Sequence, residues 1–234
     1  MLRLQNICFL STLQEYKLKH IFNCNEHSCS LSDKIKEIID LYPSIDLICL
    51  VETWLRDSDE QFFNIPGYTA YHYNRPNMRG GGISCYVSKR ILCLRTLMVG
   101  HPGQVMMLRL RANNRTELNL VVAYNPNVNL CQECMPVMDK ILQEAGNSTT
   151  FLVGDMNIDT TQNSILCQEY HNFLAAYGLT VHNSDITRPN SGTTIDHLAT
   201  NSHEGHFHID TIELDISDHN AILWSYNNKK KHAQ

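Results

Sequence analysis

"FLVGDMNIDT", Phe151 to Thr160, has the pattern of a buried strand that runs directly into a polar turn. Its apolar start is typical of a strand covered on both faces, and Gly154 then marks the end of the strand. An ordinary turn needs one Asp or Asn, yet this stretch presents Asp155 and Asn157 two residues apart. Because residues two apart on extended backbone share a face, the pair predicts a functional site at the end of this strand.

Four other apolar segments also end in, or carry, a polar side chain. Glu52 follows "DLICLV", Tyr124 ends "NLVVAY", Asp196 lies inside "TTIDHLAT", and Asp218 with His219 precedes a final strand. Strand ends converge where sheets pack together, so these groups could form one site. Each of them alone has an ordinary reading as a turn or surface residue, since Asp-x-Asn and Ser-Asp-His are common in turns.

Asp196 is the hardest of these residues to explain as an ordinary turn residue. It stands between apolar neighbours, and burying a carboxylate without a partner is costly. His219 is a suitable partner, because an Asp–His pair orients the imidazole and raises its pKa. The sequence therefore predicts an Asp196–His219 dyad.

Helical and strand patterns alternate along the chain. Helices are expected from Ser32, as N-cap, to before Pro43, from near Pro136 to Gly146, and before Gly178. Strands are expected over residues 17–23, 45–51, 104–111 and 117–124 and after the glycines 80–82, with 104–111 and 117–124 as a hairpin. This mixture predicts an α/β fold in four layers: two packed, mainly antiparallel β-sheets flanked by helices.

Length and composition narrow the function classes. The 234 residues suit one large domain, expected at residues 17–226 between an N-terminal extension (1–16) and a polar, basic tail or linker (227–234). A net charge of −5 excludes a generally basic nucleic-acid binder, although not a local basic strip. Nine cysteines without a signal peptide or an apolar run near 18 residues predict reduced thiols, an intracellular location and no membrane partner.

Two further clusters have the spacing of metal sites. "CQEC", Cys131 to Cys134, resembles half of a zinc site, but no second Cys or His pair stands at a suitable distance. "HEGHFH", residues 203–208, is expected to be a solvated loop before a strand, and the glycines 80–82 to allow a tight turn or a close approach.

Taken in order, "ETWL", "YNPN", "GDMN", "IDH" and "SDH" resemble the endonuclease/exonuclease/phosphatase superfamily, which includes pancreatic-deoxyribonuclease-like and abasic-site endonucleases. Within it, "DLICLVETWL", "GYTAYHYNRPNMRGGGISCYV" and "ITRPNSGTTIDHL" resemble the endonuclease domain of LINE-type non-LTR retrotransposons, of the jockey-like or chicken-repeat-like clades. The resemblance covers residues 17–224. It implies a pancreatic-deoxyribonuclease-like sandwich that nicks one strand of double-stranded DNA and leaves a 3′-hydroxyl.

The resemblance also implies how that hydroxyl is used. It would prime target-primed reverse transcription by a reverse transcriptase domain of the same polyprotein, expected C-terminal to this chain. Action on chromosomal DNA implies a nuclear location. An abasic-site repair nuclease, a phosphatase of small phosphoesters and an inactive binding module are the alternatives.

Metal-binding roles follow from the same resemblance. Glu52 would ligate a divalent cation, expected to be Mg²⁺ with Mn²⁺ as a substitute, and Asp218 would lie at the metal end of the site. An Asn at the end of the first strand is a further catalytic and metal-contacting residue, with Asn23 as the better match and Asn25 as the second. Because Mg²⁺ keeps several waters, one or two carboxylates suffice.

The remaining roles concern the scissile phosphate. Asp155 would activate the attacking water, Asn157 would hold the phosphate, and Asp196 would orient His219. The other implied contacts, to phosphate oxygens or elsewhere on the substrate, come from Tyr124, Thr187, Arg188 and Ser217. The turn-forming residues 189–192 predict a compact loop with Arg188 facing the DNA backbone or a narrow minor groove, and hence loose sequence preference. A loop that only closes two strands is the open alternative.

Overall fold

The structure, a computed structural model, describes residues 4–10, 31–75, 80–112, 117–203, 206–214 and 217–226. The described helices are α2 (Leu31–Leu41), α3 (Cys131–Ala145), α4 (Ile165–Ala175) and the 3-10 helices η1 (Asp57–Phe63) and η2 (Val128–Leu130). The strands are β1 (Leu4–Leu10), β2 (Leu47–Val51), β3 (Tyr68–Tyr73), β4 (Ile83–Ser88), β5 (Leu92–Gly100), β6 (Gln104–Arg111), β7 (Glu117–Tyr124), β8 (Thr150–Asp155), β9 (Thr180–Val181), β10 (Asp196–Thr200), β11 (Phe207–Ile212) and β12 (Ala221–Tyr226).

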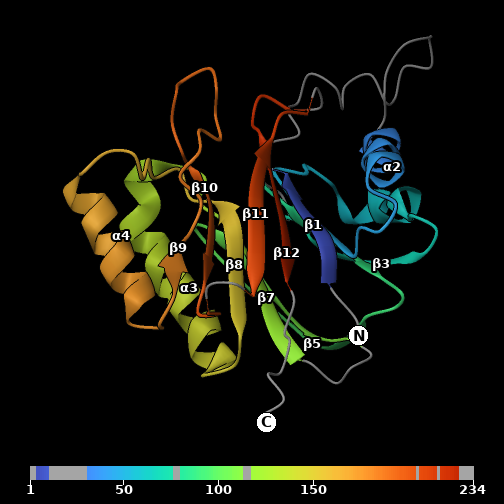
Figure 1. The fold of residues 1–234 in the computed structure, drawn as a ribbon, viewed down its shortest axis with the longest axis horizontal. Helices are drawn as coiled ribbons and strands as arrows, with labels where there is room; N and C mark the ends of the chain where they lie inside the picture. Colours follow the sequence, from blue (N-terminus) through green and yellow to red (C-terminus); the bar gives the residue numbers. More distant parts are fainter. Residues whose placement is uncertain are drawn as a thin grey trace.

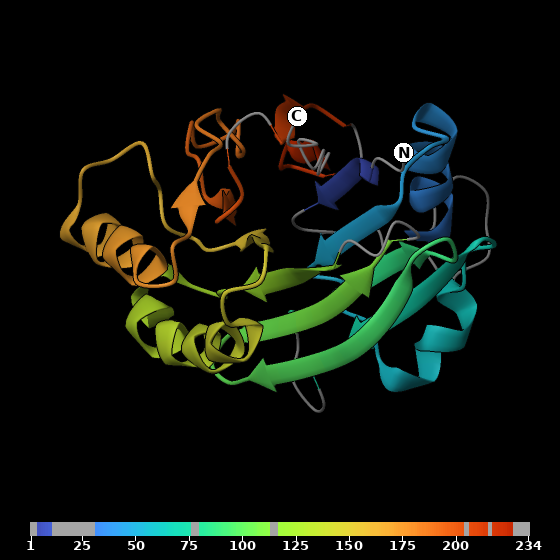
Figure 2. The same ribbon diagram turned by 60° about the horizontal axis from the view of Figure 1, so that its bottom comes forward.

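Two six-stranded sheets form the centre of the molecule. Their strand orders are β11-β12-β1-β2-β4-β3 and β5-β6-β7-β8-β10-β9. Among the described pairs, β1–β2 and β7–β8 are parallel and the others antiparallel. Figures 1 and 2 show α3 and α4 on the outer side of one sheet and α2 with η1 on the outer side of the other. The expected four-layer α/β sandwich is confirmed.

Alternation along the strands assigns side chains to three cores. In β7, Leu120 and Val122 point between the sheets, whereas Val121 and Ala123 point outward against α3. A third cluster, which includes Ile35 of α2, covers the outer face of the other sheet. Burial on both faces explains why the central strands have nearly continuous apolar sequences.

Most expected elements are present where the patterns placed them. The β6–β7 hairpin is confirmed, as are the helix before Pro43 and the strand after the three glycines. The helix α3 begins at Cys131, so Pro136 lies in its second turn rather than near its start, and Gly146 ends it with a φ of 59°. Ser32 lies inside α2, which begins at Leu31, and so is not its N-cap.

The expectation that residues 1–16 form an extension is wrong for Leu4–Leu10. This segment is β1, which pairs with β12 on one side and with β2 on the other, so it lies within the first sheet. An apolar stretch that fills a place between two strands gains hydrogen bonds along both of its edges. The expected first strand at 17–23, Asn23, Asn25 and the tail 227–234 lie outside the described residues. No helix in the described part of the chain is both long and apolar enough to cross a membrane.

Candidate active site

Strand register brings four polar residues into one row at the end of the second sheet. Gln104 pairs with Tyr124 across β6 and β7, Tyr124 with Asp155 across β7 and β8, and Asp155 with Asp196 across β8 and β10. Val122, Val153 and Leu198, two positions further along these strands, belong to the core between the sheets. Because the side-chain period of a strand is two, the row faces inward, toward the other sheet.

Asp196 and His219 form the predicted dyad. His219 Nδ1 lies 2.7 Å from Asp196 Oδ2, with 3 % of His219 and none of Asp196 exposed. One potential ligand atom from each of Asp155, Asp196 and His219 lies within 4.8 Å of the other two. Burial alone lowers the pKa of His219, but the hydrogen bond and charge of Asp196, with the charges of Asp155 and Asp218, raise the pKa above its ordinary value. This imidazole therefore keeps its proton more readily than a free histidine.

The turn after β8 holds Asp155 and Asn157 together. Asn157 adopts a left-handed φ of 51°, and its backbone N–H donates to Asp155 Oδ1 at 3.0 Å. Its side-chain Nδ2 donates to the carbonyl of Asn125 at 2.8 Å. The two predicted residues therefore lie side by side at the end of the strand.

Asn125 is a site residue that the sequence reasoning missed. Its backbone N–H donates to the carbonyl of Asp155 and its Nδ2 to the carbonyl of Met156, both at 2.8 Å. With the bond from Asn157, three contacts tie Asn125 to the turn after β8. Its position next to Tyr124 in "YNPN" was the available signal. An Asn side chain that donates to a backbone carbonyl has no characteristic sequence pattern, however, so the signal was weak.

Glu52 lies at the same end of the sandwich, on the other sheet. Its Oε2 accepts from the backbone N–H of Gly81 at 3.0 Å and from Nε1 of Trp54. The neighbouring Gly82 donates its N–H to Oε1 of Gln104 at 2.7 Å, and Gln104 is the first member of the polar row. Hydrogen bonds and strand register thus connect Glu52 to the row that contains Asp155 and Asp196.

Two of the three glycines are required because neighbouring side chains lie directly against their backbone. Gly82 has a φ of 96°, and a Cβ there would lie 2.4 Å from Thr53 Oγ1, whose residue is fully buried. Gly81 has a φ of 76°, and its Cβ would meet Gln104 Oε1 at 2.7 Å. The predicted close approach is confirmed, and it places the backbone N–H of Gly81 against Glu52.

Thr187 has a different place from the one expected. It is fully buried, and its Oγ1 accepts the backbone N–H groups of Ile195 at 3.1 Å and Asp196 at 3.0 Å. The expectation that Thr187 contacts a phosphate is therefore wrong, because no part of the residue reaches the surface. The hydroxyl instead fixes the backbone that carries Asp196.

The segment "SDHN" is tied to the chain around Thr187. Asn220 donates its backbone N–H to the Thr187 carbonyl at 2.7 Å and its Nδ2 to the Ile186 carbonyl at 3.0 Å. Ser217 Oγ accepts the backbone N–H of His219 at 3.0 Å and so shapes the turn that presents the imidazole. A substrate contact by Ser217 stays a prediction.

Arg188 begins the loop that was predicted to be compact. It forms an isolated bridge with Thr193, and the N–H of Gly192, whose φ is 67°, donates to the Arg188 carbonyl at 3.0 Å. Arg188 Nη2 lies 3.5 Å from Asp218 Oδ2. In Figure 1 the chain between β9 and β10 projects beyond the strands. The compact turn is confirmed, whereas contact with DNA stays a prediction.

The carboxylates at this end suit a hard divalent cation. Asp196 Oδ1 is buried and has no hydrogen-bond partner among the described residues, as expected of an oxygen placed for another ligand. Both donors to Glu52 bind Oε2, and no hydrogen bond of the described chain engages Oε1. Carboxylate oxygens are the ligands that Mg²⁺ prefers. Glu52 and Asp218 are not members of the close Asp155–Asp196–His219 group, so their roles as ligands stay predictions.

The cysteine pair in "CQEC" is structural. Cys131 and Cys134 are buried in α3, and burial raises the pKa of their thiols to about 12 and about 11. Neither belongs to a group of three or more metal-ligating side chains in the residues that the structure covers. Cys134 Sγ donates to Asn125 Oδ1 at 3.2 Å, so this thiol supports the residue that holds the turn after β8.

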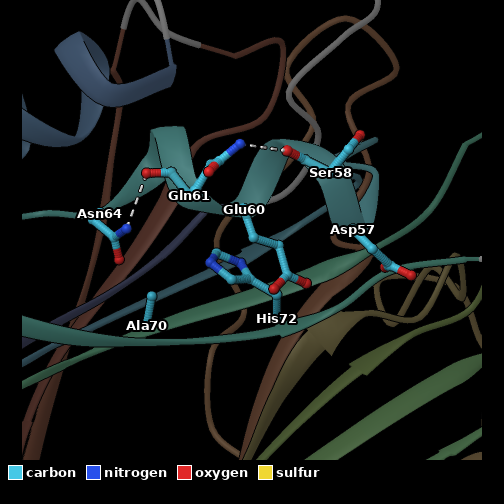
Figure 3. Close-up of a pocket in the computed structure, with 7 residues that line it drawn as sticks. All are labelled: Asp57, Ser58, Glu60, Gln61, Asn64, Ala70 and His72. Atoms are coloured by element: carbon cyan, nitrogen blue, oxygen red, sulfur yellow. Dashed lines mark hydrogen bonds between the residues drawn. The ribbon is translucent and has the colours of Figure 1, made fainter.

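A separate cavity of about 500 Å³ opens between η1 and β3 (Figure 3). Its lining consists of Asp57, Ser58, Glu60, Gln61, Asn64, Ala70 and His72. Asn74 Nδ2 donates to Asp57 Oδ1 at 2.9 Å and to Glu60 Oε1 at 2.7 Å, so the two acids are held in place by the protein. None of the predicted catalytic residues lines this cavity.

Comparison with known proteins identifies the family and the fold. The profile described as "Endonuclease/Exonuclease/phosphatase family" matches residues 21–219. The catalytic domain of human nocturnin, solved with bound sulfate, is similar at 13 % identity over 95 % of this chain and 93 % of that one, with a TM-score of 0.70. A humanized TDP2 of D. rerio is similar at 16 % identity over 96 % and 99 %, with a TM-score of 0.66.

A third similar structure is the endonuclease domain of TRAS1, a telomere-specific non-LTR retrotransposon. It shares 13 % identity over 97 % of this chain and 100 % of that domain, with a TM-score of 0.62. No curated protein sequence matches the chain. At these identities the solved structures establish the shared fold.

Proposed function

Because the chain belongs to the endonuclease/exonuclease/phosphatase family, we propose that it is a metal-dependent DNA endonuclease that nicks one strand and leaves a 3′-hydroxyl. Members of this family are hydrolytic nucleases and phosphodiesterases, so hydrolysis of a phosphoester is the shared chemistry. The observation that carries the proposal is the buried 2.7 Å contact between His219 and Asp196 with the carboxylate of Asp155 beside it.

The three side chains meet the needs of phosphodiester hydrolysis. In-line attack needs a positioned water, a base and stabilisation of charge on the phosphate oxygens. Asp155 takes a proton from the attacking water, while the second hydrogen of Asn157 Nδ2 binds a non-bridging oxygen. Protonated His219, held by Asp196, places positive charge on another oxygen, and Tyr124 adds a hydroxyl at the same end of the sheet.

The bonds and protons balance in this scheme. The water oxygen bonds to phosphorus, the bond from phosphorus to O3′ breaks, and the phosphate stays as a 5′-phosphate on the downstream strand end. The leaving O3′ takes a proton from solvent water, and Asp155 later returns its proton to solvent, so the net change is the hydrolysis of one phosphodiester bond. A divalent cation held by Glu52 would supply further positive charge to the phosphate and to the leaving oxygen.

The biological role that we propose is in retrotransposition. A 3′-hydroxyl on chromosomal DNA would prime target-primed reverse transcription by a reverse transcriptase domain C-terminal to this chain, which requires action in the nucleus. Two solved relatives support DNA as the substrate: TRAS1 is a retrotransposon endonuclease, and a D. rerio TDP2 has been solved with a single-strand DNA product. The stretches "DLICLVETWL", "GYTAYHYNRPNMRGGGISCYV" and "ITRPNSGTTIDHL" support the retrotransposon branch by their resemblance to its endonuclease domains.

The test is conversion of supercoiled plasmid to the open-circular form by the whole chain, with Mg²⁺, with Mn²⁺ and with EDTA. We expect nicking with either cation, no nicking in EDTA, and nicked ends that a polymerase extends directly. Asp155→Ala, which removes the base, is the inactive control.

Three outcomes would contradict the proposal. Full activity in EDTA would show that the reaction needs no divalent cation. Cleavage confined to abasic sites in the same assay would indicate a repair nuclease. Turnover of small phosphoesters without any nicking would indicate a phosphatase.

A further inference from the structure

We propose that Trp54 is a positioning residue for Glu52: its indole N–H fixes one carboxylate oxygen so that the other is presented to the divalent cation. This inference rests on the proposed function, in which Glu52 holds that cation. It assigns a role to the third residue of "ETWL", whose side chain is half-buried at the end of the sandwich.

Two hydrogen-bond donors converge on one carboxylate oxygen of Glu52. Nε1 of Trp54 and the backbone N–H of Gly81 both donate to Oε2, the latter at 3.0 Å. Two donors on one oxygen leave the carboxylate with a single orientation and direct Oε1 away from them. An indole N–H is a donor only and cannot itself ligate a cation, so its function toward Glu52 is orientation.

The backbone from Glu52 to Trp54 has an unusual conformation. Glu52 and Trp54 both have a left-handed φ of 55°, which is costly for residues other than glycine. The conformation is held by hydrogen bonds from Thr53 N to Gly82 O at 3.4 Å and from Trp54 N to Gly81 O at 2.9 Å. In this held conformation the side chains of Glu52 and Trp54 are turned toward each other and form a hydrogen bond.

The indole ring of Trp54 lies close to Gly80. A Cβ at Gly80 would lie 3.6 Å from Cζ2 of Trp54 and 3.8 Å from Oε2 of Glu52. An added methyl group at Gly80 would therefore touch both the ring and the carboxylate. Tryptophan is long enough to span this distance and still donate, whereas phenylalanine fills much of the space without a donor.

The second tryptophan of the chain provides a matched control. Trp224 is 1 % exposed in the core between the sheets, and its Nε1 has no hydrogen-bond partner in the described structure. Replacing each tryptophan with phenylalanine removes one indole N–H. Trp54→Phe breaks a bond to the carboxylate, and Trp224→Phe breaks none.

The experiment measures binding of Mn²⁺ to the protein without DNA, by the loss of the electron paramagnetic resonance signal of free Mn²⁺. We expect Trp54→Phe to weaken binding by about 10- to 100-fold, the usual effect of removing a group that orients a metal ligand. Trp224→Phe should bind as the wild type does, and Glu52→Gln should lose this binding. Circular dichroism of each variant verifies that the fold is retained.

A second variant separates orientation from packing. Benzothienylalanine at position 54 keeps the size and shape of the indole and replaces only the N–H by sulfur. Weak binding by this protein, as by Trp54→Phe, supports the inference. Wild-type affinity in either variant, or in Glu52→Gln, would overturn it, as would a wild type that binds no Mn²⁺. If the binding pattern is as expected but no DNA is nicked, the proposed function fails and the inference stands.

Discussion

Acidification from pH 8 to pH 5 should destabilise the protein through His197, a buried residue of β10 that contacts Tyr170 of α4. The residue has no exposed surface, and its ring contacts Tyr170 Oη through Nδ1 and the Thr194 carbonyl through Nε2, both at 3.2 Å. Burial lowers the pKa of His197 to about 4, against an ordinary value of 6.5. The imidazole therefore stays neutral in the folded protein at a pH where it is charged in the unfolded chain.

The sign and size of the effect follow from this difference in pKa. Between pH 6.5 and about 4 the unfolded chain binds the additional proton, so stability present at higher pH is lost as the pH falls through this window. The loss attributable to His197 is about 2 kcal/mol at pH 5 and about 3 kcal/mol once the pH is below both pKa values. His219 acts in the opposite direction: its folded pKa is raised, so its contribution is present below pH 6.5 and is lost as the pH rises through the folded value.

Because these two contributions oppose each other, the assay compares variants. Urea unfolding at pH 8 and pH 5 gives the change in free energy of unfolding for the wild type and for His197→Gln, whose amide does not titrate. We expect the wild type to lose about 2 kcal/mol more than the variant between the two pH values. Equal pH dependence in the wild type and His197→Gln would refute the reasoning.

Three further outcomes are expected. Gly82→Ala places a side chain at a positive φ and against a buried side chain, so it should lower the free energy of unfolding by roughly 2–4 kcal/mol. Gly67→Ala also has a positive φ but no neighbour within 4 Å, so its loss should be smaller. Urea unfolding measures both losses, and equal losses would contradict the close approach at Gly82. Changing Cys131 and Cys134 together to Ser should leave plasmid nicking nearly intact, because a hydroxyl at position 134 can still donate to Asn125 Oδ1. A loss of nicking as large as that of a catalytic variant would contradict the structural role of the two cysteines. Replacing Arg188–Thr193 by a short Gly-Ser turn should change the distribution of nick sites, mapped by sequencing, without a large change in rate; identical distributions would mean that the loop only closes two strands.

The strands that the sequence predicted well are those buried on both faces. The central strands β2, β7 and β8 carry uninterrupted apolar runs, and their ends could be read directly. The missed strands β3 and β5 lie at the edges of the two sheets and have mixed, partly exposed side chains, so their sequences lack both an apolar run and a clean alternation. Burial, rather than intrinsic propensity, made the difference.

The candidate site divides along similar lines. Asp196 and His219 could be paired from the sequence because a carboxylate inside an apolar segment requires a partner. The positions of Asn125 and Thr187 could not be predicted, because each acts through hydrogen bonds to the backbone of a residue distant in sequence or across a turn. Such contacts depend on the register of the folded strands, and neutral amides and hydroxyls have no sequence pattern that reveals it.

The most direct test of the central claim is the single-turnover rate of plasmid nicking in Mg²⁺ by Asp196→Asn compared with the wild type. The substitution keeps the size of the side chain and removes the charge that holds His219 at 2.7 Å. If Asp155, Asp196 and His219 form the catalytic group, the rate should fall by about 100-fold or more, while urea unfolding shows a folded protein. A folded Asp196→Asn protein that nicks at the wild-type rate would contradict the account.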